Sequence, residues 1–436
     1  MKCRRIIARK EAHVQICEEL GMRGKMDLGP VTDTVNAIIS NVREKRDEAV
    51  RAYTLQFDRV DLPPSSFLVT PKEMEDAMTA VAPELLRVLR TAASNIRAFH
   101  EKQKETGFSM VVAKGSRIGM LIRPLSIAGI YIPGGTAPLP STVLMNVIPA
   151  KTAGVPRVVL CTPPRADGTI APVILAAAQI AGADEIYKVG GAQAIAAMAC
   201  GTPTIPRVDK ICGPGNIYVN TAKRLVFGQV DIDMFAGPSE IVIIADDSAN
   251  PEFVAADMLS QAEHDMIASA ILLSTSETMS DAVAEAIDRR SERLDRREIL
   301  ERSLADYCAI LTVPDLDAAI AFANELAPEH LELCIRDAGS YVDQIQNAGA
   351  IFIGNYTPEP LGDYYAGPNH TLPTSGTARF FSPLNTGDFV KKMSVLQYNE
   401  ESLRDCYRDV ALFAEAEGLD GHAAAVRVRF EKEYES

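Results

Sequence analysis

The stretch Ile127-Ala128-Gly129-Ile130-Tyr131-Ile132 opens the part of the chain that decides the fold. From here on, short β-branched segments alternate with longer alanine-rich segments that have the length of helices. The expected strands are residues 127–132, 158–161, 185–189 and 210–212, and the expected helices are residues 140–153, 172–181, 192–199 and 216–227. Strands separated by such helices pair in parallel through right-handed crossovers. The pattern therefore predicts a Rossmann-like α/β domain with a parallel sheet.

The same pattern restarts after residue 239. The expected strands are residues 240–245, 268–274, 309–313, 331–335 and 350–354. The expected helices are residues 251–263, a helix that ends in the charged run 288–297, and residues 316–326 and 341–348. The first 110 residues and the last 50 look mainly helical. We therefore expect an α/β protein with two Rossmann-like α/β domains that have parallel sheets, plus small helical N-terminal and C-terminal units.

Composition and charge exclude several classes of protein. A chain of 436 residues is too long for one ordinary core, and a net charge of −14 argues against a nucleic-acid partner. No run approaches the roughly 20 apolar residues of a membrane span, and the basic start lacks the apolar stretch of a secretory signal. The eight cysteines never form CxxC. We therefore expect reduced thiols in a cytoplasmic protein, and no zinc site built from cysteine.

Four of the six histidines lie after residue 260, each close in sequence to a carboxylate or an amide. They are His264, His330, His370 and His422. Imidazole and carboxylate together can bind a divalent metal and can also move protons near neutral pH. This clustering favours an enzyme.

Two of these histidines have a polar partner at a defined spacing. Gln261 and His264 lie three residues apart on one predicted helix, so they share a face and could bind one cation. A polar helix end at the surface is the alternative. Glu329 and His330 follow Pro328 where a helix stops and a strand starts, which predicts two acid–base groups on a fixed turn at a sheet edge. A solvated pair in a loop is the alternative.

The segment 356–374 has four prolines and two glycines in 19 residues and no helical or strand period. A loop of this kind is typical of a binding site, and Asp363 and His370 supply an oxygen and an imidazole there. His422 begins the predicted final helix, with Glu417 five residues earlier, and a helix-cap histidine is the alternative. Gln261, His264, Asp363 and His422 would together give the mixed nitrogen and oxygen shell that suits zinc, although spacing alone does not prove that they converge.

A candidate nucleotide loop is Gly213-Pro214-Gly215-Asn216, which opens a helix directly after a strand. A helix N-terminus of this kind can hold pyrophosphate. The loop is not GxGxxG, because the sixth position is Tyr218, and a structural turn is an equal alternative. Ser239 could cap a helix or contact a ligand, and no GxSxG motif surrounds it, which argues against a serine hydrolase.

Several long blocks of the chain, in the same order, resemble the histidinol dehydrogenase family. The blocks are residues 129–135, 189–196, 211–219, 236–240, 260–265, 327–333 and 354–379. The match runs nearly without gaps from about residue 118 to residue 383, whereas the first hundred residues are generic. The resemblance implies oxidation of L-histidinol to L-histidine through the aldehyde, with two NAD consumed in succession and one zinc ion per subunit.

The resemblance also implies a role for each candidate residue. His330 would take the alcohol proton, and Glu329 would activate water. The implied zinc ligands, which would also touch the substrate as His330 does, are Gln261, His264, Asp363 and His422. The implied further substrate contacts are Ser239, His370 and Glu417, and the implied NAD contacts are Tyr131, Gln193 and Asn216. Glu417 and His422 would come from the partner subunit, which implies an intertwined homodimer.

Four domains are expected on this basis. Residues 1–25 form an N-terminal helical segment, and residues 26–132 with 241–384 form a first α/β domain that carries the metal and catalytic residues. Residues 133–240 form a second Rossmann-like α/β domain on the NAD side. Residues 385–436 form a C-terminal helical tail that contributes to the partner's active site.

Three alternative functions differ from this one. The nearest is a paralogous dehydrogenase that keeps zinc and NAD but oxidises another small amino or sulfonated alcohol, and His370 and Glu417 favour histidinol over it. A zinc hydrolase that uses Glu329 is disfavoured because the HExxH helix is absent. A non-catalytic scaffold is disfavoured because so many polar groups lie on rigid turns.

Overall fold

The computed structural model describes residues 3–7, 29–134, 138–235 and 237–430, which fall into two units. The first unit comprises Met1–Gln103 and Leu125–Phe389, and the second comprises Lys104–Pro124 and Val390–Ser436. The predicted N-terminal helical segment 1–25 lies outside the described residues apart from residues 3–7. Among the described residues, none of the helices combines the length and apolarity needed to cross a membrane.

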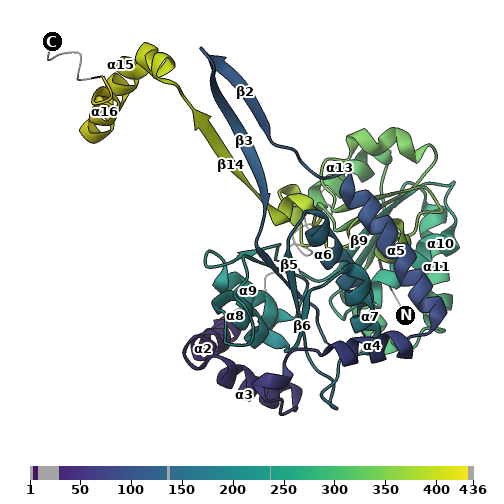
Figure 1. Cartoon of the computed structure of the whole chain (residues 1–436). Helices are drawn as coiled ribbons and strands as arrows, with labels where there is room; N and C mark the ends of the chain where they lie inside the picture. The colour runs from purple at the N-terminus through teal and green to yellow at the C-terminus, as the bar shows by residue number, and fades with distance from the viewer. Residues whose placement is uncertain (1–2, 8–28, 135–137, 236, 431–436) are drawn as a thin grey trace, which may run out of the picture. The chain divides into compact units, whose positions relative to one another are not determined.

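The first sheet of the first unit has five parallel strands in the order β6-β5-β4-β7-β8. The strands are β4 (Ile127–Tyr131), β5 (Arg157–Thr162), β6 (Glu185–Lys188), β7 (Lys210–Cys212) and β8 (Asp231–Ile232). One face packs against α4 (Pro71–Ala80), α5 (Pro83–Glu101), α6 (Pro140–Thr152) and α7 (Pro172–Ala181). The other face packs against α2 (Gly29–Lys45), α3 (Asp47–Asp58), α8 (Gly191–Cys200) and α9 (Ile217–Val226) (Figure 1). The first predicted Rossmann-like sandwich is therefore confirmed.

The second sheet has six parallel strands in the order β1-β11-β10-β9-β12-β13. The strands are β1 (Arg4–Ile7), β9 (Glu240–Ala245), β10 (Ser269–Ser274), β11 (Ala309–Thr312), β12 (His330–Cys334) and β13 (Ala350–Ile353). One face packs against α10 (Pro251–Ala262), α11 (Glu277–Ser291) and α12 (Arg297–Asp306). The other face packs against α13 (Leu316–Leu326) and the 3-10 helix η2 (Ala338–Gln344). This confirms the second α/β sandwich.

Three details of the sandwich built on the six-stranded sheet differ from the sequence prediction. The edge strand β1 is not predicted, because its sequence reads only as a basic start. The charged run 288–297 ends α11 and begins a separate helix, α12. The predicted helix 341–348 is instead the 3-10 helix η2, which ends at Gln344.

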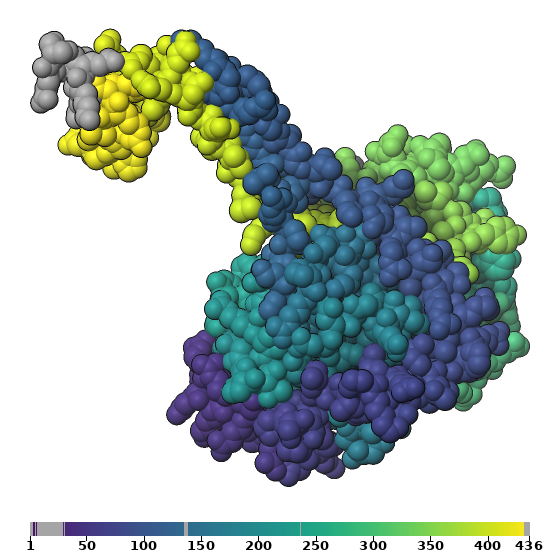
Figure 2. All heavy atoms as spheres, in the orientation of Figure 1, coloured from purple at the N-terminus to yellow at the C-terminus, as the bar shows by residue number. Residues whose placement is uncertain are grey.

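The second unit is built on an antiparallel sheet in the order β14-β3-β2. Its strands are β2 (Phe108–Ala113), β3 (Ser116–Pro124) and β14 (Val390–Gln397), and its helices are α15 (Glu400–Ala416) and α16 (Asp420–Arg427). In Figure 2 the yellow-green atoms of β14 lie beside the blue atoms of β2 and β3. The prediction that the last 50 residues are helical is wrong for β14. Apolar side chains are exposed on both faces of this strand, so the period-2 alternation of a half-buried strand is missing.

Short helical turns occupy the connections of the first unit. They are η1 (Pro64–Ser66), α14 (Glu359–Leu361), the π-helical turn η3 (Gly362–Ala366), η4 (Thr377–Arg379) and η5 (Thr386–Phe389). Two of these, α14 and η3, lie inside the segment 356–374, for which the sequence predicts no regular structure. They place two carboxylates in the candidate site.

Candidate active site

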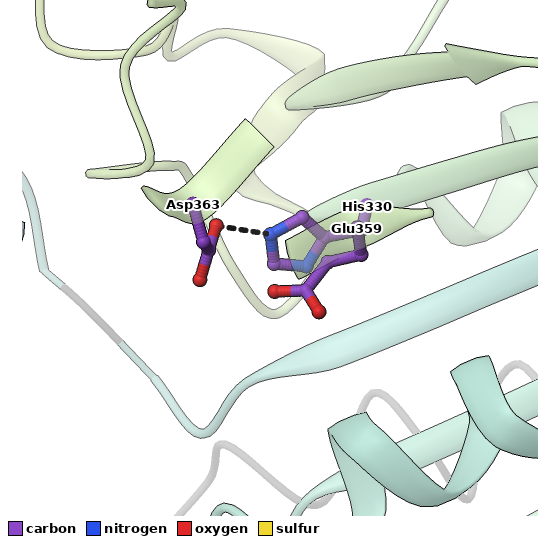
Figure 3. Close-up of side chains that lie close together, drawn as sticks. All are labelled: His330, Glu359 and Asp363. Atoms are coloured by element: carbon purple, nitrogen blue, oxygen red, sulfur yellow. Dashed lines mark ion pairs between the residues drawn. The ribbon is translucent and has the colours of Figure 1, made fainter. Parts of the chain in front are cut away.

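His330 is the first residue of β12 and pairs with Ile241 of β9, so its side chain faces the side of the sheet that α10 covers. The ring is buried, and its Nδ1 lies 3.1 Å from the backbone oxygen of Glu240. Because a carbonyl oxygen can only accept, Nδ1 carries the proton and Nε2 keeps its lone pair. Nε2 lies 3.8 Å from Oδ1 of Asp363 (Figure 3). Burial lowers the pKa of His330 to about 3, so the ring is a neutral base at physiological pH.

Glu329 places a second acid–base group beside this imidazole. Its carboxylate Oε2 accepts the backbone N–H of Glu240 at 3.0 Å and lies 3.7 Å from Nδ1 of His330. Burial raises the pKa of Glu329 well above its usual range, and the nearby carboxylates of Glu240, Asp363 and Glu359 raise it further. The predicted turn is also present, because Ala327 ends α13 in the left-handed conformation with φ 50° directly before Pro328.

Glu359 lies in the turn α14 and Asp363 in the turn η3, and both side chains lie beside the His330 ring (Figure 3). His330, Glu359 and Asp363 each offer one ligand atom, and these three atoms lie within 4.8 Å of one another. Burial, followed by the charge of Asp363, raises the pKa of Glu359 to about 8, and burial raises the pKa of Asp363 to about 6. A divalent cation would relieve this crowding of carboxylates.

Gln261 and His264 stand at the C-terminal end of α10. The side chain of Gln261 is only 1% exposed, yet neither its Nε2 nor its Oε1 has a hydrogen-bond partner among the described residues. A buried amide without a hydrogen-bond partner is costly. The side-chain oxygen of Gln261 is therefore suited to bind a cation or a substrate. His264 and His370 each lower the pKa of both His330 and Glu359 by their charge, which places both histidines in the electrostatic neighbourhood of this site.

A pocket with a volume of about 430 Å³ opens beside these groups. Asp363 and His370 line it together with the apolar side chains of Phe352, Leu361 and Leu372. Such a volume and such a mixture of apolar walls and a few polar groups are typical of sites for small molecules.

The predicted substrate contact Ser239 lies at the same edge of the six-stranded sheet. It precedes β9, and its backbone oxygen accepts the N–H of Ser269 at 3.1 Å. Because Glu329 and His330 stand at the start of the neighbouring strand β12, these residues all lie at the amino-terminal edge of this sheet.

The predicted NAD contacts lie at the carboxyl-terminal edge of the five-stranded sheet. The chain leaves β4 toward β5 on one side, whereas β7 lies on the other side of β4, and ligands of open α/β sheets bind at such a switch point. Tyr131 ends β4, and its hydroxyl accepts the N–H of Gly191 at 3.0 Å. Gln193 follows on α8, fully buried, with neither amide atom hydrogen-bonded within the described part of the chain. Asn216 caps α9, and its Oδ1 accepts the N–H groups of Tyr218 and Val219.

The buried ion pair Lys223–Asp233 fixes the backbone of the loop that precedes Asn216. Lys223 of α9 donates to the backbone oxygen of Gly213 at 2.9 Å, and Asp233 accepts the N–H of Gly213 at 2.7 Å. Lys223 and Asp233 also pair with each other, and both side chains are about 1% exposed. Gly213 has φ +114° and no room for a Cβ, which would lie 2.0 Å from the backbone oxygen of Tyr131. Both backbone groups of this glycine are therefore fixed.

Glu417 and His422 belong to the second unit. Glu417 is the C-cap residue of α15, and His422 lies in the first turn of α16; both are exposed. The convergence of His422 with Gln261, His264 and Asp363 therefore stays a prediction. Within the first unit, the structure brings Glu329, His330 and Asp363 together.

Sequence reasoning misses several buried charged residues of the first unit. Glu359 is one, although the dense prolines of Pro358-Glu359-Pro360 mark it as lying on a rigid turn. Glu332 is another: it follows His330 on the same strand face, and its carboxylate accepts the N–H of Glu359 at 2.9 Å. Lys223 and Asp233 complete the set. A lysine and carboxylates in helices and strands read as solvated residues until the packing around them is known.

Comparisons with known proteins identify the family of the chain. The model of the family "Histidinol dehydrogenase" matches residues 22–430. A histidinol dehydrogenase of Moorella thermoacetica is 52% identical over 401 residues, which cover 92% of this chain and 95% of that protein. One of Caldanaerobacter subterraneus is 52% identical over 421 residues, which cover 97% of each chain. The crystal structure of histidinol dehydrogenase from Elizabethkingia anophelis has a TM-score of 0.93 and 40% identity, and covers 100% of this chain and 99% of its own. The chain therefore belongs to the histidinol dehydrogenase family of oxidoreductases.

Proposed function

We propose that the protein oxidises L-histidinol to L-histidine through L-histidinaldehyde, with two successive hydride transfers to NAD and one zinc ion per subunit. The observation that carries the proposal is the pair of buried acid–base groups at the start of β12. His330 presents a free lone pair on Nε2, and Glu329 is a separate carboxyl with a raised pKa. Two oxidation steps with different proton acceptors need such a pair.

Zinc would be held by Gln261, His264 and Asp363 together with His422 of a second copy of the chain. The donor set fits, because the buried amide of Gln261 has no partner in the described residues and Asp363 lies in a group of three ligand atoms within 4.8 Å. When bound, the ion would supply a fixed attachment point for the amine and imidazole of the substrate, which is orientation more than activation. Glu359 and His330, the other members of that group, would stay free to bind the substrate and move its protons.

In the first oxidation, His330 accepts the hydroxyl proton of histidinol on Nε2 as the hydride leaves the carbinol carbon for NAD. The hydrogen bond from Nδ1–H to Glu240 holds the ring in the tautomer that this step needs. The ring enters the reaction uncharged because its pKa is lowered to about 3.

In the second oxidation, Glu329 takes a proton from water, the oxygen of which adds to the aldehyde carbon. When ionised, a carboxyl group with a raised pKa is a stronger base than an exposed carboxylate. The resulting diol anion loses its hydride to the second NAD and its remaining hydroxyl proton to the protein, which leaves the carboxylate of histidine.

NAD would bind at the carboxyl-terminal edge of the five-stranded sheet, in contact with Tyr131, Gln193 and Asn216. The unpartnered amide of Gln193 and the immobilised Gly213 loop support this site. Backbone N–H groups at the start of α9 suit the phosphates even without GxGxxG.

We also propose an intertwined homodimer, in which Glu417 and His422 of one copy reach the site of the other and join Ser239 and His370 around the substrate. The support is the second unit itself, whose sheet exposes apolar side chains that a stable protein covers. They include Phe108, Met110, Val111, Val395 and Leu396. The protein would act in the cytoplasm, where its free cysteines stay reduced.

Incubation of the purified protein with L-histidinol and NAD tests the proposed function. Two NADH formed per histidinol support it, whereas turnover only with another small amino or sulfonated alcohol would indicate the paralogous dehydrogenase. Mixing inactive His422→Ala and His330→Ala proteins tests the dimer. The mixture regains activity if one heterodimer site receives both native residues, and it stays inactive if each chain completes its own site.

A further inference from the structure

Helix α5 lies against the site segment that carries Asp363 and His370. Asn95 of α5 donates from Nδ2 to the backbone oxygen of Tyr365 at 2.8 Å. Two residues further along, Gly367 has φ +120°, and a Cβ there would lie 2.8 Å from the backbone oxygen of Asn95. The segment therefore packs against α5 on both sides of Ala366, although α5 lies in the first hundred residues, where the sequence analysis singles out no candidate site residue.

A third contact joins the C-terminal end of α5 to the residue directly before His370. His100 is 0% exposed and Asn369 is 4% exposed. Asn369 donates from Nδ2 to the backbone oxygen of Met145 at 2.6 Å, and the same Nδ2 lies 3.3 Å from Nε2 of His100. On its other side, Asn369 accepts the N–H of Thr371 on Oδ1 at 2.8 Å. The side chain of Asn369 thus spans the backbone of His370.

The hydrogen bonds of this network have only one consistent direction. The backbone oxygen of Met145 and the N–H of Thr371 fix which end of the Asn369 amide is Nδ2. Because Nδ2 can only donate, Nε2 of His100 accepts, and Nδ1 of His100 carries the proton. That proton points to Oε1 of Gln103, 2.6 Å away. Burial lowers the pKa of His100, in agreement with a neutral ring.

We propose that Asn369 and His100 are positioning residues that hold His370 in place for the substrate. The inference rests on the proposed role of His370 as a substrate contact. Asn369 bridges the backbone on either side of His370, and His100 anchors Asn369 to α5 with a bond that solvent cannot replace. Loss of either partner leaves a buried polar group unpaired, and the segment can relieve this only by moving, which displaces the His370 side chain.

Four variants test this role. His100→Leu removes the acceptor, and His100→Gln returns an oxygen acceptor near the position of Nε2. Asn369→Asp keeps the acceptor for Thr371 and removes both amide donors. Ser94→Ala, at an exposed position of the same helix, is the matched control.

We expect His100→Leu and Asn369→Asp to raise the KM for L-histidinol by about tenfold or more, because small displacements of a positioning group are costly. The KM for NAD and the bound zinc should stay at wild-type values. His100→Gln should recover most of the loss, and Ser94→Ala should have no effect. A wild-type KM for histidinol in folded His100→Leu and Asn369→Asp would overturn the proposal. An apparent kcat that falls only in proportion to the fraction of folded protein, with an unchanged KM for histidinol, would overturn it too.

A spectroscopic readout does not depend on turnover. The chain has six histidines, so nitrogen resonances of the labelled rings can be assigned by single substitutions. The wild-type His100 should show the Nδ1–H tautomer, and the His370 resonances should shift in Asn369→Asp but not in Ser94→Ala. If the His370 resonances do not shift in Asn369→Asp, the positioning role is refuted, even if the protein oxidises histidinol. Shifted resonances in a protein that leaves histidinol untouched would instead refute the proposed function alone.

Discussion

The two α/β halves of the first unit use opposite edges of their sheets. In the five-stranded sheet, Tyr131 and the Gly213 loop follow the carboxyl ends of β4 and β7, where open α/β sheets ordinarily bind ligands. In the six-stranded sheet, Ser239, Glu329 and His330 stand at or before the amino ends of β9 and β12. The usual rule for α/β proteins therefore locates the half in which we propose that NAD binds, and it fails for the half that carries the acid–base groups.

The chemistry of the two edges differs as much as their direction. Gln193 and Asn216 carry amides that never ionise, and the backbone around Gly213 is held at both its N–H and its carbonyl. At the other edge, burial moves two ionisable groups in opposite directions, lowering the pKa of His330 and raising the pKa of Glu329. Burial disfavours the charged form in both cases. We infer that the edge of the five-stranded sheet binds a ligand in a fixed position and that the edge of the six-stranded sheet exchanges protons.

If this division is correct, loss of His330 has the largest kinetic effect. His330→Asn keeps a donor toward the backbone oxygen of Glu240 and removes the Nε2 lone pair. We expect kcat for histidinol to fall by about a hundredfold to ten-thousandfold, the range of a lost general base. The KM for NAD should stay within about twofold, because the opposite edge is untouched. Steady-state NADH formation measures both, and a kcat loss of less than about tenfold would remove His330 from the proton transfer.

Loss of Glu329 should separate the two oxidations. Glu329→Gln still accepts the N–H of Glu240 and cannot take a proton from water. The second step should slow by about a hundredfold or more while the first continues. NADH formed per histidinol in a single turnover should then drop from two toward one, with the aldehyde accumulating. If both hydride transfers slow equally, the carboxyl serves the site as a whole and not the water step.

The sequence predicts the cores of both sandwiches because their strands are continuous apolar runs. The strands β7 and β9 and the helices α7 and α13 have the predicted bounds. The antiparallel strands β2, β3 and β14 are not predicted. Their apolar side chains lie on both faces without a clear period, and β14 pairs with β3 across more than 250 residues of the chain.

The candidate site is predictable only where a motif or a rigid turn marks it. Glu329, His330 and Asp363 stand beside prolines or on irregular backbone, and the sequence singles them out. Glu359 and Lys223 become recognisable only in the folded chain, since Lys223 is a buried cation only when the end of β8 brings Asp233 beside the Gly213 loop. Neither residue lies in a motif, so the partners of each are not evident from the sequence.

Loss of Lys223 should disturb the NAD edge and spare the catalytic one. Lys223→Met leaves Asp233 buried without its cation and frees the backbone oxygen of Gly213, so the free energy of unfolding should fall by about 3–5 kcal/mol. In the folded fraction, the KM for NAD should rise by about tenfold, and the KM for histidinol should change little. The exposed neighbour Arg224 gives the control Arg224→Met. Equal changes in both KM values would mean that the ion pair supports the fold and has no special relation to the cofactor.

The smallest effect concerns the pH dependence of stability in protein stripped of metal by a chelator. The pKa of Glu359 rises from 4.5 to about 8 on folding, so the folded chain binds this proton more tightly than the unfolded chain. The stabilisation is complete below about pH 4.5 and is lost as the pH rises toward 8, with a slope of at most about 1.4 kcal/mol per pH unit. The Tm of the stripped protein should therefore fall between pH 5 and pH 8 by a few degrees.

Glu359→Gln cannot ionise, so its Tm should vary less over this interval, whereas the control Glu298→Gln, at an exposed position of α12, should keep the wild-type slope. Added zinc should also flatten the wild-type slope, because a cation beside Asp363 favours the ionised carboxylates that burial alone disfavours. If the slope of Tm against pH stays the same in Glu359→Gln and in the presence of zinc, the ionisable groups at the edge of the six-stranded sheet do not distinguish it from the proposed NAD edge. The comparison of the two edges would then rest on strand direction alone.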